Sequence, residues 1–319
     1  MQQNEVYQKI TDTVLQYLEK PIHTNVSWQK QWRHFAGNNH QSILGRTYKG
    51  VNQLLCGIQA NNNNYKSKKW ATFKQWNNMG HRIKKGESAL SIIMFKKVNK
   101  TEIIKTDNNH KPIEEKKTYN LLKTYMVFNG SQIENYVEPE VMEPKTTWEE
   151  QDFLMIDNRA KELGAKIVHR EDQPYFSPLH DFINMPNKFQ FEKPEHYYAT
   201  FLHELTHWTD KEGRSPREKK ISEILKNDGN RFYPDNYAFE ELVAELGSAF
   251  LLSHYNLSSD EQMRVDHIPY IQSWIKQLKQ NNQTIIKASA FAQKACDFIT
   301  GETYVEKEYK PKEGELSNV

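Results

Sequence analysis

The chain has few cysteines and no long apolar run. Cys56 and Cys296 are its only cysteines in 319 residues, too few for the disulfide framework of a small secreted protein. No run of about 18 apolar residues could span a membrane, and the polar N-terminus lacks a signal-peptide profile. We therefore expect a cytoplasmic protein that has no membrane partner.

The chain also has little net charge, but its charges are unevenly distributed. Residues 1–140 contain 21 Lys and Arg against 11 Asp and Glu, a net charge of +10, whereas the remainder has a net charge of −8. The boundary falls in an acidic, proline-bearing segment typical of an extended linker. We expect domains at 1–136 and 149–300, a linker over 137–148, and a charged, disordered tail over 301–319.

The most informative motif is H-E-x-x-H at residues 203–207. On a helix, His203 and His207 lie one turn apart on the same face, so both imidazoles can bind one metal ion. We expect one Zn²⁺ ion per chain, with another divalent ion such as Mn²⁺ as the alternative. Glu204 beside the metal is the candidate catalytic base. Apolar residues at helical spacing around the motif, after Pro194, predict a helix with a face in the core; otherwise the histidines are ordinary surface or core residues.

A catalytic zinc site usually has three protein ligands, and the segment 237–250 contains the best candidate for the third. Glu241 lies on a small, acidic stripe of a predicted helix and is our expected ligand. Glu245, one turn further on, is expected to accept the ring N–H of His203. Glu240 is the rival ligand but faces about 100° away from Glu241. Without a metal, these glutamates would simply form an acidic, solvated helix face.

Aromatic and basic residues are interleaved in the basic half, from Trp28 and Trp32 to Trp76. Rings stack on bases and cations neutralise phosphates, so this pattern indicates a binding site for single-stranded nucleic acid. The alternative is that the aromatic side chains fill a small core beneath a solubilising shell of lysines. The candidate DNA contacts are Tyr48, Lys49, Asn52, Lys69, Trp70, Lys74, Lys84 and Lys85.

Apolar periodicity predicts several further elements. Residues 6–18 have the spacing of an amphipathic helix. Residues 91–95 and 125–128 have the composition of strands, and the polar segment 99–118 is expected to form an exposed hairpin or loop between them. A strand at 181–185 is expected to present an edge with which an extended peptide substrate could pair.

Several short motifs resemble ArdC-type antirestriction proteins, which are carried by conjugative plasmids and related mobile elements. Those similar to the family's N-terminal single-stranded-DNA-binding domain are YKGVNQLL at 48–55, WATFKQ at 70–75, and the glycine and lysine residues of 80–87. Those similar to its zincin-type metallopeptidase domain are YFSP at 175–178, DFINMP at 181–186, YYAT at 197–200, the H-E-x-x-H helix and EELVAE at 240–245. The resemblance covers roughly residues 5–300.

This resemblance implies an α+β protein with two domains, a basic α+β single-stranded-DNA-binding domain and a zincin-like (gluzincin) metallopeptidase domain. It implies that the third ligand is the glutamate of the second helix, in agreement with Glu241. It further implies a bacterial protein that protects incoming plasmid or mobile-element DNA from host restriction, with single-stranded DNA and an unidentified protein or peptide as partners. The segments 61–64 and 210–214 depart from the family pattern.

Three hypotheses follow. In the first, Glu204 acts as base and then as acid in zinc-dependent peptide hydrolysis, with Tyr233, Tyr237 and His254 as candidate oxyanion partners. In the second, the protein coats DNA and its zinc site is structural or vestigial. In the third, it is an ordinary peptidase whose basic half binds acidic partners.

Overall fold

The computed structural model describes residues 3–19, 39–106, 112–138, 149–225, 234–257 and 268–302. Several expectations lie outside these ranges, namely those on Trp28, Trp32, Tyr233, linker residues 139–148 and tail residues 303–319. Within the described ranges, no helix is long and apolar enough to cross a membrane.

The N-terminal half is built on a four-stranded sheet with the strand order β1-β2-β4-β3. The strands are β1 (Gln41–Ser42), β2 (Lys69–Thr72), β3 (Leu90–Thr106) and β4 (Pro112–Asn129). Trp70 and Ala71 alternate in β2 and belong to different apolar clusters. Trp70 belongs to the large cluster, which includes side chains of α1 (Gln3–Leu18) and α3 (Val51–Asn62), and Ala71 belongs to a small cluster with Trp76 of α4 (Phe73–Asn78). The helix predicted at 6–18 is therefore confirmed as α1.

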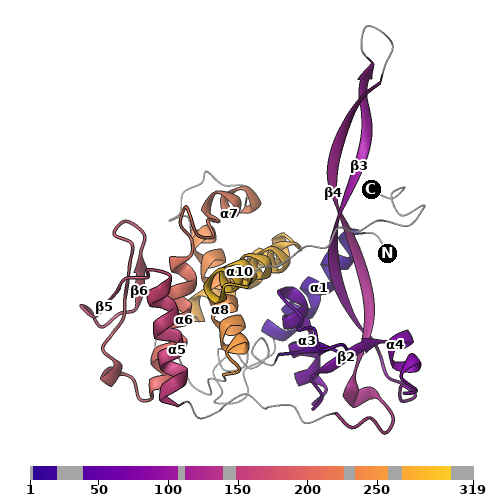
Figure 1. Ribbon diagram of the computed structural model, residues 1–319, viewed down its shortest axis with the longest axis horizontal. Helices are drawn as coiled ribbons and strands as arrows, with labels where there is room; N and C mark the ends of the chain where they lie inside the picture. Colours follow the sequence, from indigo (N-terminus) through magenta and orange to yellow (C-terminus); the bar gives the residue numbers. More distant parts are fainter. Residues whose placement is uncertain are drawn as a thin grey trace.

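Strands β3 and β4 form a long ribbon that extends away from the body of the protein (Figure 1). Their register runs from Leu90 opposite Val127 to Thr106 opposite Pro112, with one irregularity between Ile103 and Lys105. Of the two alternatives for segment 99–118, the hairpin is correct, and most of the segment is strand. Beyond the other strands of the sheet, the backbone N–H and C=O groups of β3 and β4 pair with each other. The ribbon therefore needs no further strand to satisfy these groups.

The C-terminal half combines a small sheet with a group of helices (Figure 1). The sheet has the order β5-β7-β6, with β5 (Ile167–Val168), β6 (Tyr175–Ser177) and β7 (Phe182–Asn184). The α-helices are α5 (Glu150–Glu162), α6 (Pro194–Trp208), α7 (Glu218–Leu225), α8 (Pro234–His254), α9 (Ile268–Gln280) and α10 (Thr284–Thr300). Short 3-10 helices follow β4 and β7, at η1 (Gly130–Gln132) and η2 (Lys188–Gln190).

The strand predicted at 181–185 forms as β7, but the expectation that it presents an edge is wrong. β7 pairs with β5 on one side and with β6 on the other, so its backbone groups are occupied. Within the described sheet, β6 pairs only with β7, and its Tyr175 and Phe176 line a pocket. The edge that faces the pocket is therefore β6. The five-residue pattern at 181–185 could not reveal which short segments flank it.

Helices α6 and α8 approach closely because small residues lie where they cross. A Cβ atom at Gly247 would lie 2.5 Å from Cγ2 and 2.7 Å from Oγ1 of Thr206, distances that ordinary packing does not allow. Nearby, Ser248 Oγ donates to the Ala199 carbonyl at 3.1 Å. The small stripe expected along residues 238–248 thus lets α8 present its glutamates directly to α6.

The two halves pack against each other through one continuous apolar cluster, which includes side chains of α1, α3, α6, α8 and α10. Polar contacts join the same surfaces. Thr11 Oγ1 donates to the Asn282 carbonyl at 2.8 Å, and Gln53 Nε2 donates to Ser253 Oγ at 3.0 Å. The domain boundaries expected near residues 136 and 149 stay predictions. The N-terminal and C-terminal halves are nevertheless packed directly against each other.

We expect Gly247→Ala to destabilise the protein by about 1–3 kcal/mol, because overpacking forces α6 and α8 apart. Thermal unfolding of the metal-free protein measures this effect. In the double variant Thr206→Ala/Gly247→Ala, part of the stability should be recovered, since the clashing side-chain atoms are removed. An unchanged melting temperature in Gly247→Ala would contradict the close crossing.

Candidate metal centre and active site

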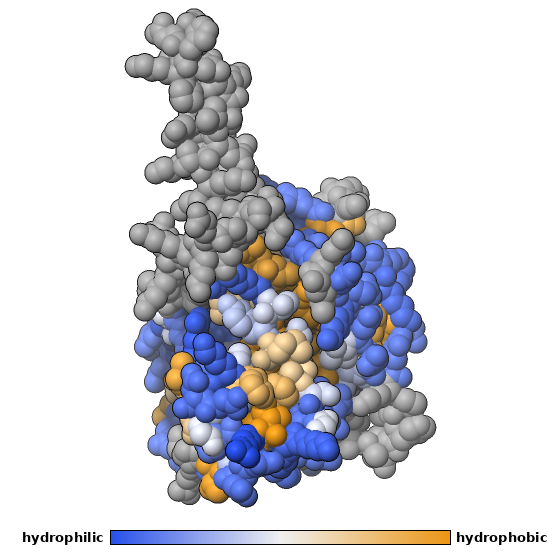
Figure 2. All heavy atoms as spheres, turned by 90° about the vertical axis from the view of Figure 1, so that its right-hand side faces the viewer, coloured by the Kyte–Doolittle hydropathy of each residue, from blue (hydrophilic) through white to orange (hydrophobic). Residues whose placement is uncertain are grey.

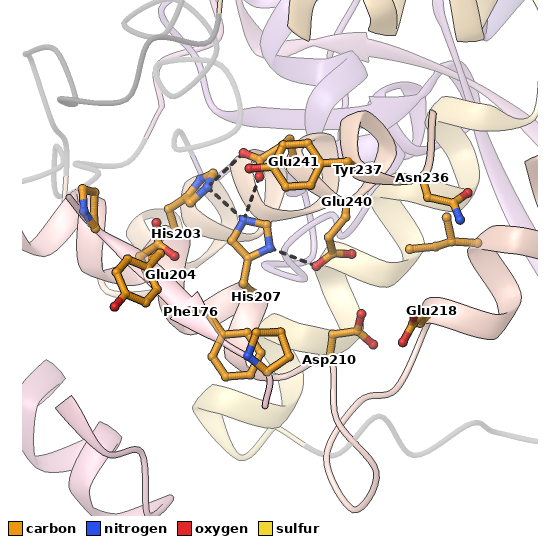
Figure 3. Close-up of a pocket in the computed structure, with 14 residues that line it drawn as sticks. Phe176, His203, Glu204, His207, Asp210, Glu218, Asn236, Tyr237, Glu240 and Glu241 are labelled. Atoms are coloured by element: carbon orange, nitrogen blue, oxygen red, sulfur yellow. Dashed lines mark hydrogen bonds and ion pairs between the residues drawn. The ribbon is translucent and has the colours of Figure 1, made fainter. Parts of the chain in front are cut away.

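Helices α6 and α8 bring the three expected metal ligands together. His203, His207 and Glu241 are all buried, and each offers a ligand atom within 4.8 Å of the others. The two histidine Nε2 atoms lie 3.1 Å apart, and Glu241 places Oε2 3.4 Å from that of His203 and Oε1 3.4 Å from that of His207 (Figure 3). Nitrogen ligands of a tetrahedral zinc ion lie roughly 3.3 Å apart, so the cluster has the dimensions of a metal site.

The orientation of the imidazoles favours a cation between them. His203 Nδ1 lies 3.3 Å from Glu245, and His207 Nδ1 lies 3.1 Å from Glu240. A carboxylate only accepts hydrogen bonds, so a neutral His207 carries its proton on Nδ1, and the nearby Glu245 favours the same tautomer for His203. The lone pairs of both Nε2 atoms then converge. These lone pairs repel each other unless a cation lies between them. Two imidazole nitrogens and one carboxylate are a donor set that suits Zn²⁺ and also Mn²⁺.

The surrounding charges also favour a cation. Burial opposes protonation of His203, but Glu241 and Glu245 outweigh it and raise the pKa of that imidazole to about 10. Burial likewise opposes protonation of His207, and Glu241 with Glu240 raises its pKa to about 9. The same carboxylates that would hold extra protons here would hold a metal ion.

Glu204 lies beside this centre, in a pocket of about 210 Å³. It is buried, and burial raises the pKa of its carboxyl group above the usual range. The backbone N–H of Phe176 in β6 donates to the Glu204 carboxylate, which fixes its direction. The pocket wall next to it is largely apolar and includes Pro174, Tyr175, Phe176, Pro178, Ile221 and Tyr237. A carboxylate with a raised pKa, held in an apolar pocket, is suited to proton transfer.

The two described candidates for the oxyanion partner, Tyr237 and His254, lie in different pockets. Tyr237 lines the pocket and precedes Glu241 by one turn of α8 (Figure 3). His254 lies at the other end of α8, in a different pocket, with its Nδ1 3.3 Å from Glu302. Of these two residues, Tyr237 is the one at the metal centre.

Arg217 belongs to a part of the site that the sequence did not indicate, and its partner Glu240 has a different role from the one considered there. Glu240, the rival third ligand, lies on the far side of His207 from Glu241 and pairs with the guanidinium of Arg217. Burial opposes ionisation of Glu240, but Arg217 and His207 lower its pKa to about 2. No spacing rule marks Arg217, because a buried arginine is defined by partners that only the fold supplies.

Four of the expected DNA contacts serve other purposes in the fold, which corrects the expectation for Trp70 and Asn52 in particular. Trp70 is fully buried and its indole N–H donates to His40 Nδ1 at 3.2 Å. Asn52 exchanges two hydrogen bonds with the Ile93 backbone, at 2.6 and 3.0 Å. Lys49 pairs with Asp297 and Glu302, and Tyr48 packs partly buried against the core. Trp70 and Asn52 therefore stabilise the N-terminal half itself, and Lys49 joins it to the C-terminal half.

The other expected DNA contacts are more accessible. Lys74, Lys84 and Lys85 are exposed, whereas Lys69 is half-buried and donates to Gln41 Oε1 at 2.7 Å. Phe73, directly before Lys74, is 58% exposed, and it was not among the expected contacts. On this side of the protein, Figure 2 shows an apolar patch surrounded by hydrophilic residues.

Comparison with known families agrees with this architecture. Residues 4–128 match the N-terminal domain of the anti-restriction factor ArdC. Residues 155–291 match a zincin-like metallopeptidase domain, a class of domain that implies a bound metal.

Two curated relatives differ in length. The chain is 29% identical over 286 residues to the DNA primase TraC of Escherichia coli, a match that covers 85% of this chain but 18% of the primase. It is 26% identical over 298 residues to the uncharacterized protein y4eC of Sinorhizobium fredii, which covers 92% of this chain and 91% of that protein.

Two solved structures are similar along nearly their whole length. The metal-free antirestriction ArdC protein from the R388 plasmid has a TM-score of 0.69 and 28% identity, covering 92% of this chain and 96% of that one. Its Mn(II)-bound structure has a TM-score of 0.68 and 29% identity, covering 93% and 97%. The order of the two matched domains and this shared fold show that the chain belongs to the ArdC-type antirestriction proteins, with an ArdC N-terminal domain followed by a zincin-like metallopeptidase domain.

Proposed function

We propose that this protein binds single-stranded DNA through its N-terminal half and hydrolyses peptide bonds at a zinc centre in its C-terminal half. Its role would be to protect incoming plasmid or mobile-element DNA from host restriction. The observation that carries the peptidase part is the position of Glu204 beside the converging His203, His207 and Glu241. Similarity to an antirestriction protein and to a DNA primase supports the DNA-binding part.

In this proposal, Glu204 is the general base and then the general acid. It accepts a proton from a water molecule in the pocket as the water oxygen bonds to the carbonyl carbon, and it delivers that proton to the amine nitrogen as the C–N bond breaks. A divalent ion held by His203, His207 and Glu241 would polarise the carbonyl and acidify the water. The raised pKa of Glu204 suits both proton transfers.

Strand β6 would guide an extended substrate past these groups. It is the pocket-facing edge of its sheet, and a peptide bound alongside it could form main-chain hydrogen bonds. Tyr237, at the opposite wall, is the candidate to stabilise the oxyanion.

The alternative is a DNA-coating protein whose metal site is structural or vestigial. Structural zinc sites usually have four protein ligands, whereas catalytic sites have three and keep one position open. Three ligand residues meet here at the wall of a pocket, which favours catalysis. Salt-dependent binding of single-stranded but not double-stranded DNA would argue against the third hypothesis, a peptidase whose basic half binds acidic partners.

For DNA binding, the exposed lysines near α4 are the best candidates among the residues expected from the sequence. Lys74, Lys84 and Lys85 can reach phosphates, and the exposed ring of Phe73 can stack on a base. Thr72 pairs with Val127, so Phe73 follows at the level of Met126, which is 47% exposed. Cations beside an accessible apolar surface suit a flexible strand with exposed bases.

Glu204→Gln should lower any peptide hydrolysis by about 10²-fold or more, because the amide cannot transfer the proton. Metal affinity and affinity for single-stranded DNA should be retained. Candidate proteins, including this one, are incubated with metal and with or without single-stranded DNA, and cleavage is followed by mass spectrometry. Glu195→Gln, on the same helix outside the pocket, is the matched control. Cleavage that persists in Glu204→Gln would refute this mechanism.

Metal removal should destabilise the protein, because the convergent lone pairs and buried carboxylates lose their counterion. Adding Zn²⁺ or Mn²⁺ at about 100 times its dissociation constant should stabilise the protein by about 2.7 kcal/mol. Differential scanning fluorimetry with and without chelator measures this. Glu241→Gln should weaken the response, and an identical melting temperature with and without metal would count against a metal centre.

The double variant Lys84→Ala/Lys85→Ala should weaken binding to single-stranded DNA. The salt dependence of binding should also fall, by about 0.7 in log–log slope for each phosphate that the variant no longer neutralises. Lys219→Ala/Lys220→Ala, an exposed lysine pair on α7, is the matched control and should have little effect. Fluorescence anisotropy at several salt concentrations distinguishes the two. Equally weakened binding in both variants would show that affinity depends on net charge and not on this surface.

A further inference from the structure

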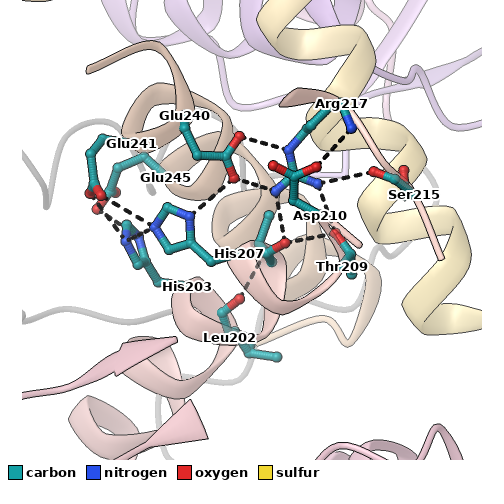
Figure 4. A network of polar contacts seen from close by, with 11 residues as sticks. Leu202, His203, His207, Thr209, Asp210, Ser215, Arg217, Glu240, Glu241 and Glu245 are labelled. Atoms are coloured by element: carbon teal, nitrogen blue, oxygen red, sulfur yellow. Dashed lines mark hydrogen bonds and ion pairs between the residues drawn. The ribbon is translucent and has the colours of Figure 1, made fainter. Parts of the chain in front are cut away.

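Arg217 is a buried arginine directly behind the metal centre. Its side chain is 1% exposed, and it lies between the loop that follows α6 and the start of α7. Its Nε donates to Glu240 Oε2 at 2.7 Å, and its Nη2 donates to Glu240 Oε1 (Figure 4). The guanidinium therefore holds both oxygens of one carboxylate, a bidentate geometry that a lysine cannot reproduce.

The remaining N–H groups of the guanidinium are also used. Nη2 donates to the Thr206 carbonyl at 2.9 Å, and Nη1 donates to Thr209 Oγ1 at 2.9 Å and to the Ser215 carbonyl at 3.4 Å. Its backbone N–H donates to Asp210 Oδ1 at 2.7 Å. Because all five donors of the side chain have acceptors, its orientation is fixed. The hydrogen bond to Thr206 ties it to the helical turn that carries the metal-binding histidines.

Glu240 connects Arg217 with His207, one of the candidate metal ligands. Its Oε1 lies 3.1 Å from His207 Nδ1. An ionised carboxylate can only accept a hydrogen bond, so the proton between these two atoms belongs to Nδ1. His207 therefore keeps its proton on Nδ1 and directs the Nε2 lone pair toward Glu241 and His203. Without Arg217, Glu240 could turn on its side-chain bonds, and nothing would then hold His207 in one ring orientation and one tautomer.

We infer that Arg217 is a positioning residue of the metal centre, which holds Glu240 against His207 Nδ1 so that His207 Nε2 points at the metal. This rests on the proposed metal centre but not on proteolysis. Arg217 touches neither the substrate pocket nor the three ligands. Arg217 has two connections to the ligands, through Glu240 to the ring of His207 and through the Thr206 carbonyl to the backbone of α6, and the inference concerns the first.

A second arginine in the same loop provides a control. Arg214 also grips a carboxylate with two nitrogens, at 2.8 and 2.7 Å from Asp181, and it stacks over the ring of Trp208. Like Arg217 it donates to a backbone carbonyl of α6, that of Trp208 at 2.7 Å. Its partner Asp181, however, has no contact with a metal ligand among the described interactions. Arg214→Lys thus disturbs the same loop but leaves the contacts from Arg217 through Glu240 to His207 intact.

The test measures Zn²⁺ and Mn²⁺ affinity of metal-free full-length protein by competition with a chromophoric chelator, together with the melting temperature of each variant. Arg217→Lys and Glu240→Gln should each lower metal affinity by about 10- to 100-fold. The double variant should bind metal no more weakly than the weaker single variant, because both changes break the same chain. Arg214→Lys should change metal affinity less than about twofold, even if its melting temperature falls.

Unchanged affinity in a folded Arg217→Lys protein would overturn the inference, as would an equal decrease in Arg214→Lys or an additive decrease in the double variant. Glu240→Gln keeps the test decisive if Arg217→Lys does not fold, because the inference fails if Glu240→Gln binds metal like the wild type. A wild-type protein that binds neither metal would overturn both the inference and the proposed zinc centre. Absence of proteolysis with normal metal binding would overturn only the proposed peptidase function.

Discussion

Two imidazole nitrogens that face each other across 3.1 Å, in a buried site rich in carboxylates, set the main constraint on this structure. Glu204, Glu240, Glu241 and Glu245 are all buried around the two histidines. Buried charges are costly unless they are paired or bind a metal. Arg217 compensates Glu240, and a metal ion between the histidines would compensate Glu241. The packing of the C-terminal half keeps these glutamates, histidines and Arg217 buried next to one another.

Helix α8 connects the metal centre with the N-terminal half. Its first turns carry Glu241 and Glu245, Gly247 lets it approach α6, and its last turns carry Ser253. Ser253 is hydrogen-bonded to Asn39 and to Gln53 of α3. Lys49, one of the residues expected to contact DNA, pairs there with Asp297 of α10 and with Glu302. One helix thus runs from the candidate active site to the surface where the N-terminal half is attached.

The candidate metal ligands could be proposed from the sequence because the spacing within each pair is local, although the contact between the two helices is not. His203 and His207 share one helix face, Glu241 and Glu245 share another, and helical spacing alone places each pair. Arg217 could not be predicted, because its burial depends on Glu240, Thr206 and Thr209, which lie on different segments of the chain. The central position of β7 in its sheet could not be predicted either, because it depends on pairing with the separate segments β5 and β6. Trp70 was expected to contact DNA but is buried, because an aromatic residue among lysines in the sequence can equally belong to a core.

The most direct test of the metal centre is to measure the metal content and X-ray absorption spectrum of the wild-type protein, purified without chelator. We expect about one divalent ion per chain, with two imidazole nitrogens at roughly 2.0–2.1 Å and at least one carboxylate oxygen in its coordination shell. Glu241→Gln should retain little of this metal. Substoichiometric metal in the wild type, or a spectrum without imidazole ligands, would contradict the proposed metal centre.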